Sequence, residues 1–183
     1  MILKSIKLTF STILFVLCFI NNLRSDEVKK IEFFGNDRVS NDTILMFSKI
    51  DIGQNLDEES LNQALINLYK SNFFKNVNVQ LTNNILKITV IENPLIEKID
   101  FKGIKAKRIL EDISENLVLK SRSSYNATLS KNDLKKIKSN LKKQGYFFSE
   151  VDLFVEELNN NKVNLTYEIR LGNKSKIKKI KFI

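Results

Sequence analysis

The chain has 183 residues, of which 43% are hydrophobic and 28% charged, and its formal net charge is +9 at pH 7. This composition is typical of a protein that buries a core, and it excludes a disordered polymer. The sequence contains no histidine and a single cysteine, Cys18, which excludes Ser/His/Asp and Cys/His catalysis, histidine metal ligands and an internal disulfide.

The first 25 residues have the layout of a secretory signal peptide. A basic start at Lys4 and Lys7 precedes an apolar run over residues 8–20 and a polar tail. The apolar run is short for a membrane span, so we expect residues 1–25 to direct export. The site before Asp26 lacks a small residue at position −3, which leaves an uncleaved anchor as the alternative.

The positive charge does not by itself indicate a ligand. Lys4, Lys7 and Arg24 supply three of the positive charges, which leaves +6 from Asp26 onward. The remaining lysines collect on no evident face, so the charge speaks to solubility more than to a polyanion site. Export would also remove nucleic acid and cytosolic cofactors from the expected partners.

A strand, a turn and a short helix are predicted after the leader. Apolar and polar residues alternate over residues 28–34, and Gly35 then suits a sharp exit from the strand. Ser40 or Asn41 is predicted to cap a short helix, which stops near Gly53.

The next stretch predicts an amphipathic helix and a β-hairpin. Asp57 is predicted to cap the helix, and leucines at spacings of four and three form its apolar face. After Phe73 and Phe74 the period changes to two, and Asn83 with Asn84 supplies the turn between two alternating strands. The order of this unit is therefore β-α-α-β-β.

The same plan is repeated after Pro94. Proline lacks an amide donor, so it suits a joint between two units better than a ladder interior. We therefore place one unit at residues 26–93 and a second at residues 94–172, which gives tandem units of the α+β class. Ile180-Lys181-Phe182 repeats the opening of a unit, so residues 173–183 are interpreted as the first strand of a truncated third unit.

Two local predictions apply to the second unit. Ser130 is predicted to cap its second helix, with Asp133 at the third helical position. Tyr146, Phe147 and Phe148 follow this helix as the aromatic pair does in the first unit. We expect all these aromatic residues to fill the space between helix end and sheet rather than to bind an aromatic ligand.

Together these motifs resemble the polypeptide-transport-associated (POTRA) domains of the BamA family of outer-membrane protein assembly factors. The matching residues are Ile31, Phe33, Gly35, Asn36, Arg38 and Val39, then Gly53, Leu68, Tyr69, Phe74 and Val77, then Val90, Glu92 and Pro94, and in the second unit Ile99, Phe101, Gly103, Gly145 and Val151. The second unit has Gly103-Ile104 in place of Gly-Asn, so the conformation of that turn is left open.

The resemblance implies units with a three-stranded mixed sheet and two helices packed on one face. It implies a non-enzymatic arm without cofactor or metal, at the periplasmic face of the outer membrane, held there by a C-terminal barrel that this sequence lacks. The partners it implies are unfolded outer-membrane proteins and the lipoproteins of the assembly complex, and not nucleic acid.

We expect client binding by β-augmentation, in which an extended segment pairs with a free sheet edge in each hairpin. The alternative is that these residues merely build the sheets. The predicted edge residues are Val77, Asn78, Val79, Gln80 and Leu81 in the first unit, and Val151, Asp152, Leu153, Phe154 and Val155 in the second.

Three other interpretations remain at this stage. Two-partner secretion transporters and TamA-type factors carry the same kind of unit, whereas the cell-division protein FtsQ has one unit behind an anchor and does not fit a tandem array. A basic RNA-binding α+β domain is a second alternative. A secreted carboxylate enzyme is a third, although the adjacent acids Glu58-Glu59 and Glu156-Glu157 point in different directions and make poor acid/base couples.

Overall fold

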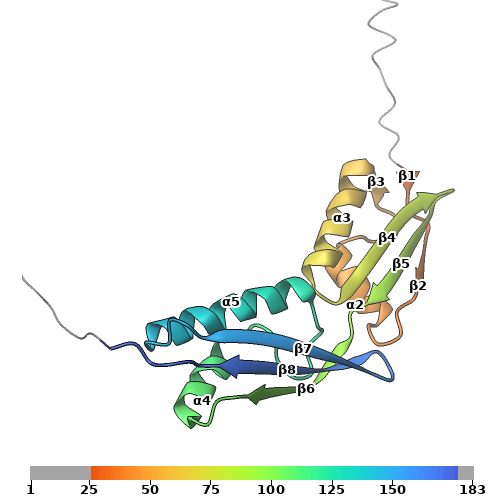
Figure 1. Cartoon of the computed structure of the whole chain (residues 1–183). Coiled ribbons are helices and arrows are strands. Elements are labelled where there is room, and N and C mark those ends of the chain that lie inside the picture. The colour runs from red at the N-terminus through yellow and green to blue at the C-terminus, as the bar shows by residue number, and fades with distance from the viewer. Residues whose placement is uncertain (1–25, 177–183) are drawn as a thin grey trace, which may run out of the picture.

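The computed structural model describes residues 26–176 (Figure 1). The predicted signal peptide at residues 1–25 lies outside the described residues, as do residues 177–183 of the predicted third-unit strand. No helix in the described range is long and apolar enough to cross a membrane.

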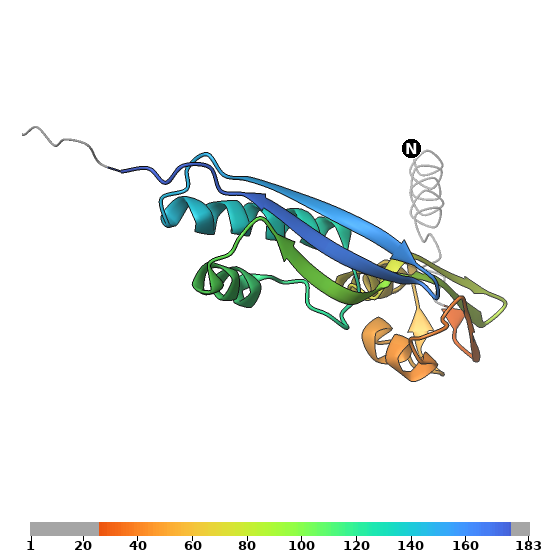
Figure 2. The same ribbon diagram turned by 60° about the horizontal axis from the view of Figure 1, so that its bottom comes forward.

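The described residues form two successive β-α-α-β-β units. The first contains β1 (Asp26–Glu27), β2 (Lys30–Phe34), α2 (Asn41–Ser48), β3 (Asn55–Leu56), α3 (Glu58–Lys70), β4 (Phe74–Thr82) and β5 (Ile85–Glu92). The second contains β6 (Leu95–Lys102), α4 (Lys107–Asn116), α5 (Ala127–Lys143), β7 (Glu150–Leu158) and β8 (Lys162–Arg170). The two units follow one another end to end and meet where β5 gives way to β6 (Figure 2).

Each unit is built on a three-stranded mixed sheet. The strand order is β2-β5-β4 in the first and β6-β8-β7 in the second. The last strand of each unit lies in the middle, parallel to the first strand and antiparallel to its hairpin partner. The predicted fold class is therefore confirmed. A short antiparallel ribbon between β1 and β3 was not predicted, because pairs of residues are too short to show a period.

The alternating residues of the hairpins set one buried and one wet face. In β5, Leu86, Ile88 and Val90 are buried, and the residues between them are exposed. The buried set packs with residues of α2 and α3 into one core. Asn83 and Asn84 have φ values of 52° and 64°. Positive φ at both positions is typical of the two-residue hairpin turn whose twist matches that of the flanking strands.

The helix caps of the first unit are as predicted, and the cap of α5 is not. Ser40 and Asp57 accept the amides of Thr43 and Ser60 respectively. In the second unit the cap is Asn126, not Ser130, and α5 begins three residues before Ser130.

Ser130 and Asp133 have other roles inside α5. The Ser130 hydroxyl donates to the Ala127 carbonyl within the helix. The buried Asp133 carboxylate accepts the amides of Val118 and Leu119 at 2.8 and 2.9 Å, which fixes the loop before α5. At the earlier start, the Asn126 side chain accepts the amides of Thr128 and Leu129 at 2.8 and 3.2 Å, which satisfies two amides of the first turn.

The aromatic residues pack as predicted in the first unit and only in part in the second. Phe74 is buried, and the Phe73 ring lies 5.6 Å from the ring of Phe47. Tyr146 packs against the second core, but Phe147 and Phe148 are 54% and 79% exposed, so the predicted packing of these two is wrong. The connection from α5 to β7 is longer than that from α3 to β4, and it carries both rings out of the sheet.

Gly35 and Gly103 make the same contact with the central strand of their units. Their φ values are +79° and +88°, and a Cβ at either position would overlap a backbone carbonyl, that of Val90 or Ile169. The conformation of the glycine is therefore the same in the two units although Ile104 follows Gly103, whereas the connection to the next helix is shorter in the second unit. A side chain at either glycine would displace the end of the central strand.

We predict that Gly35→Ala lowers the free energy of unfolding by about 2 kcal/mol or more, because strain and overlap with Val90 act together. Gly53→Ala is the matched control, since Gly53 has a φ of +86° but nothing within 4 Å of the added Cβ. Urea denaturation of both variants measures the difference. Equal losses would show that the carbonyl contact does not matter.

The Asp57 cap predicts a pH dependence. Hydrogen bonding with Ser60 lowers the pKa of the Asp57 carboxyl. A lowered folded-state pKa gives stability that is present above the unfolded pKa and is lost as pH falls through the folded one. The wild-type chain should therefore lose stability relative to Asp57→Asn, which caps without titrating, as the pH falls from about 5 through the lowered pKa of Asp57. Parallel curves of unfolding free energy against pH would contradict this.

Candidate functional site

The predicted client-binding residues all lie on free sheet edges. Residues 77–81 belong to β4 and residues 151–155 to β7, and each strand pairs on one side only. The structure thus brings the ten residues together as two groups of five, one in each sheet. An edge strand presents unpaired backbone groups, which another extended chain can use.

The edge of β4 is closed at one end by a tyrosine. The Tyr69 hydroxyl accepts the Val77 amide at 3.2 Å and donates to the Asn76 side chain at 3.0 Å. The Val77 amide therefore faces away from β5. Because backbone groups alternate along a strand, the amides of Val79 and Leu81 face the same free side. The role of Tyr69 was missed from the sequence, since its contact with the edge depends on how α3 packs.

The edge of β7 has equivalent positions. Ile169 meets Gly103 as Val90 meets Gly35, so these two central-strand residues correspond. Their hairpin partners are Val151 and Val77. The amide of Leu153, two positions beyond Val151, therefore faces the free edge, as the amide of Val79 does in β4.

The β7 edge lacks the tyrosine stop of β4. Leu68 and Leu141 are fully buried at the same distance from the ends of their helices, so Lys142 stands where Tyr69 stands in the first unit. A lysine ammonium has no acceptor for a backbone amide. The edge of β7 is therefore the more open of the two.

Strand β7 carries acidic side chains on its exposed face. Arg170 on β8 bonds Glu150 at 3.0 Å and Asp152 at 2.7 Å. The hydrogen bond with Glu150, and to a smaller extent the one with Asp152, raises the pKa of Arg170. Phe154, next but one along the strand, is 56% exposed. The face beside the free edge is thus partly neutralised and partly apolar.

A buried carboxylate ties the two units together. Glu92 Oε1 accepts the amides of Arg38 and Val39 at 2.9 and 2.7 Å, and its side chain is 4% exposed. Arg38 Nε lies 3.5 Å from the other carboxylate oxygen. The same guanidinium donates to the Asn93 carbonyl at 3.3 Å and to Ser124 Oγ at 3.0 Å. One residue pair thus joins a turn, the linker and a loop of the second unit.

Asparagines complete this junction. Asn72, at a φ of 62°, accepts the side chain of Asn93 at its carbonyl and that of Asn126 at its Oδ1. Asn161 donates to the Glu92 carbonyl at 3.3 Å. Sequence analysis missed these residues, because asparagine is abundant in this chain and no short spacing marks contacts between distant segments.

The model of the POTRA family, described as a surface antigen variable number repeat, matches residues 27–93 and again residues 94–172. The chain belongs to the POTRA family.

Known proteins agree with this assignment. The outer membrane protein assembly factor BamA of Neorickettsia risticii is 25% identical over 160 residues, which is 86% of this chain and 21% of the relative. The chain therefore spans about a fifth of the length of this relative.

Two solved structures share the fold. POTRA1-2 of the periplasmic domain of Omp85 from Anabaena gives a TM-score of 0.52 at 13% identity, over 83% of this chain and 99% of that one. The N-terminal domain of Omp85 from Thermosynechococcus elongatus gives 0.53 at 15% identity, over 77% and 61%.

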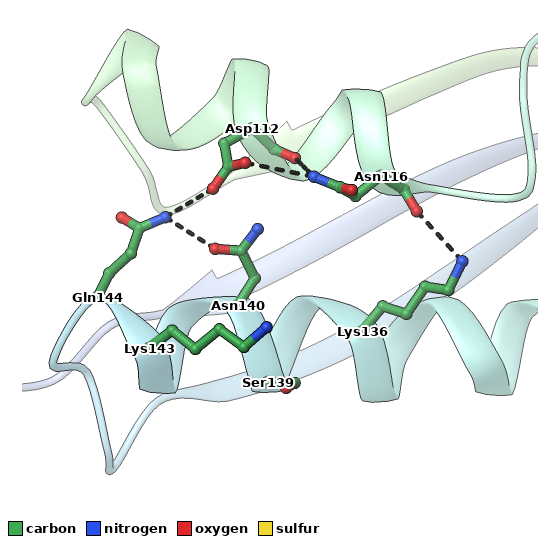
Figure 3. Close-up of a pocket in the computed structure, with 7 residues that line it drawn as sticks. All are labelled: Asp112, Asn116, Lys136, Ser139, Asn140, Lys143 and Gln144. Atoms are coloured by element: carbon green, nitrogen blue, oxygen red, sulfur yellow. Dashed lines mark hydrogen bonds between the residues drawn. The ribbon is translucent and has the colours of Figure 1, made fainter.

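A polar cavity lies between the two helices of the second POTRA unit (Figure 3). Gln144 donates to Asp112 at 2.9 Å and to Asn140 at 2.8 Å, and Lys136 donates to the Asn116 carbonyl at 3.4 Å. These side chains use their polar groups on one another, which suits joining α4 to α5. Within residues 26–176, no cluster of three or more acidic side chains is placed to hold a metal ion.

We predict that Glu92→Leu lowers the free energy of unfolding of the first POTRA unit by about 3 kcal/mol, because two buried amides and Arg38 lose their acceptor. Protection of the Arg38 and Val39 amides from hydrogen exchange should fall as well. Glu97→Leu, which breaks the exposed pair with Lys162, is the control and should change little. Similar losses in both variants would contradict the role given to Glu92.

Proposed function

We propose that this chain is the periplasmic arm of an outer-membrane β-barrel assembly factor. In this proposal, β4 and β7 bind extended segments of nascent outer-membrane proteins by β-augmentation, so that they can be folded and inserted. The observation that carries it is the presence, in both POTRA units, of a hairpin strand with one unpaired edge and outward-facing amides at Val79 and Leu153.

Backbone pairing suits this task because it tolerates different client sequences. Strands of outer-membrane barrels share an alternation of apolar and polar residues but no common sequence. An edge that recognises main-chain groups can therefore accept many of them, while the faces of the sheet favour the alternation.

The rest of the proposal draws on the family and the relative. The relative carries the name of an outer-membrane protein assembly factor. The POTRA units cover residues 27–93 and 94–172 of this chain. We extend this to a location at the periplasmic face of the outer membrane after export, attachment through a C-terminal barrel, and contact with assembly-complex lipoproteins. The arm acts by binding and not by catalysis.

Proline substitution at the outward-facing amides tests the proposal. Val79→Pro and Leu153→Pro each remove one edge amide, which an edge strand tolerates, whereas Val79→Ala and Leu153→Ala remove the side chain and keep the amide. We expect the double proline variant to bind a labelled synthetic barrel-strand peptide of about ten residues at least about tenfold more weakly. The double alanine variant should stay within about threefold of the wild type.

Fluorescence anisotropy at physiological salt measures both affinities, and circular dichroism checks that each variant is folded. Equal binding by folded proline and alanine variants would contradict β-augmentation. A labelled single-stranded RNA serves as the second ligand. Binding of RNA without binding of the peptide would replace the proposal with the nucleic-acid interpretation.

A further inference from the structure

A cavity of about 390 Å³ lies between the two POTRA units. It receives side chains from α3 and β4 of the first unit, from the linker, and from the start of α5 and the hairpin of the second. Its apolar and aromatic lining consists of Tyr69, Phe74, Pro94, Tyr125, Val155 and Val163. The site therefore exists only where both units are present.

Several polar groups of the cavity lining are already engaged, although the lining also includes the charged side chains of Lys75 and Glu157. The Asn93 amide bonds the Phe73 carbonyl at 2.7 Å, and the Tyr125 amide bonds the Pro94 carbonyl at 2.7 Å. The Asn126 side chain bonds Asn72 and caps α5. A polar ligand would find few free partners among these groups, whereas an apolar one would gain from burial against the rings.

The cavity reaches β7, the strand that has the free edge in the second sheet. Val155 and Glu157 both belong to β7 and both line the cavity. They lie on the same face of the sheet as the buried Val151, because side chains alternate along a strand. Side chains of neighbouring strands that stand opposite one another share a face. A segment paired with β7 opposite Val155 therefore directs a side chain to the face of the sheet on which the cavity lies.

We infer that the cavity between the units receives one large apolar side chain, best an aromatic one, from a client strand paired with β7. This inference rests on the proposed function. It adds a preference for one client side chain to a strand edge that otherwise recognises only main-chain groups of the client. The lining rings and the space favour an aromatic residue, since such rings bury the most area and pack well against one another.

Two labelled peptides test the inference. Both have about ten residues of alternating threonine and valine, and they differ at one central position, which is phenylalanine in one and serine in the other. We expect the phenylalanine peptide to bind the wild-type chain about tenfold to about a hundredfold more tightly.

A substitution that fills the cavity should remove this difference. Ala127 lines the cavity at the exposed first residue of α5, so Ala127→Trp places a ring there without changing a buried core position. Lys131→Trp, exposed on the same helix and outside the cavity lining, is the matched control. Ala127→Trp should reduce binding of the phenylalanine peptide to the level of the serine peptide, and Lys131→Trp should preserve the difference.

The outcomes separate the two proposals. If the two peptides bind the wild-type chain with equal affinity and Leu153→Pro weakens the binding of both, the cavity does not receive a client side chain, but binding at the edge of β7 is supported. If Ala127→Trp and Lys131→Trp change the difference between the two peptides equally, the proposed role of the cavity is contradicted as well. Binding of neither peptide would overturn the proposed function together with the inference. The wild-type comparison does not depend on how the tryptophan variants fold.

Discussion

The buried carboxylate of Glu92 is the constraint on which the arrangement of the units depends. It ends the central strand of the first sheet, and both of its nearest donors are backbone amides of the turn that leads to α2. A buried amide needs a partner, so the turn is held in one place. Because the Arg38 side chain then reaches Ser124, the second unit is positioned by the same group. The cavity between the two units depends on this arrangement, because residues of both units line it.

The repeat preserves topology more closely than it preserves individual contacts. The glycine that meets the central strand is present in both units. The Glu92 carboxylate that fixes the turn before α2, however, has no counterpart in the second unit. Because Ile169 corresponds to Val90, Leu171 stands where Glu92 stands, and it packs against the second core. The buried carboxylate of the second unit is instead Asp133 of α5, which fixes the loop between α4 and α5, a different connection from the one that Glu92 holds.

Local sequence patterns predicted the helices and strands, but they did not predict the contacts between them. The change of period after α3 and the Asn83-Asn84 pair were enough to predict the first hairpin, because both act over a few residues. The start of α5 was misplaced because Asn126 and Ser130 are both good caps, and local sequence does not choose between them. The exposure of Phe148 and the junction contacts depend likewise on packing that no short spacing records.

The strand order has a consequence for how such an arm forms. In both sheets the strand that joins the other two is the last of its unit in the chain. A chain that emerges from its amino end therefore holds the first strand and the helices without a completed sheet until that last strand appears. Since Glu92 closes β5, the first unit gains its sheet and the anchor of its turn at the same moment. Each unit thus completes itself before the next has begun, and the arm can be built one unit at a time.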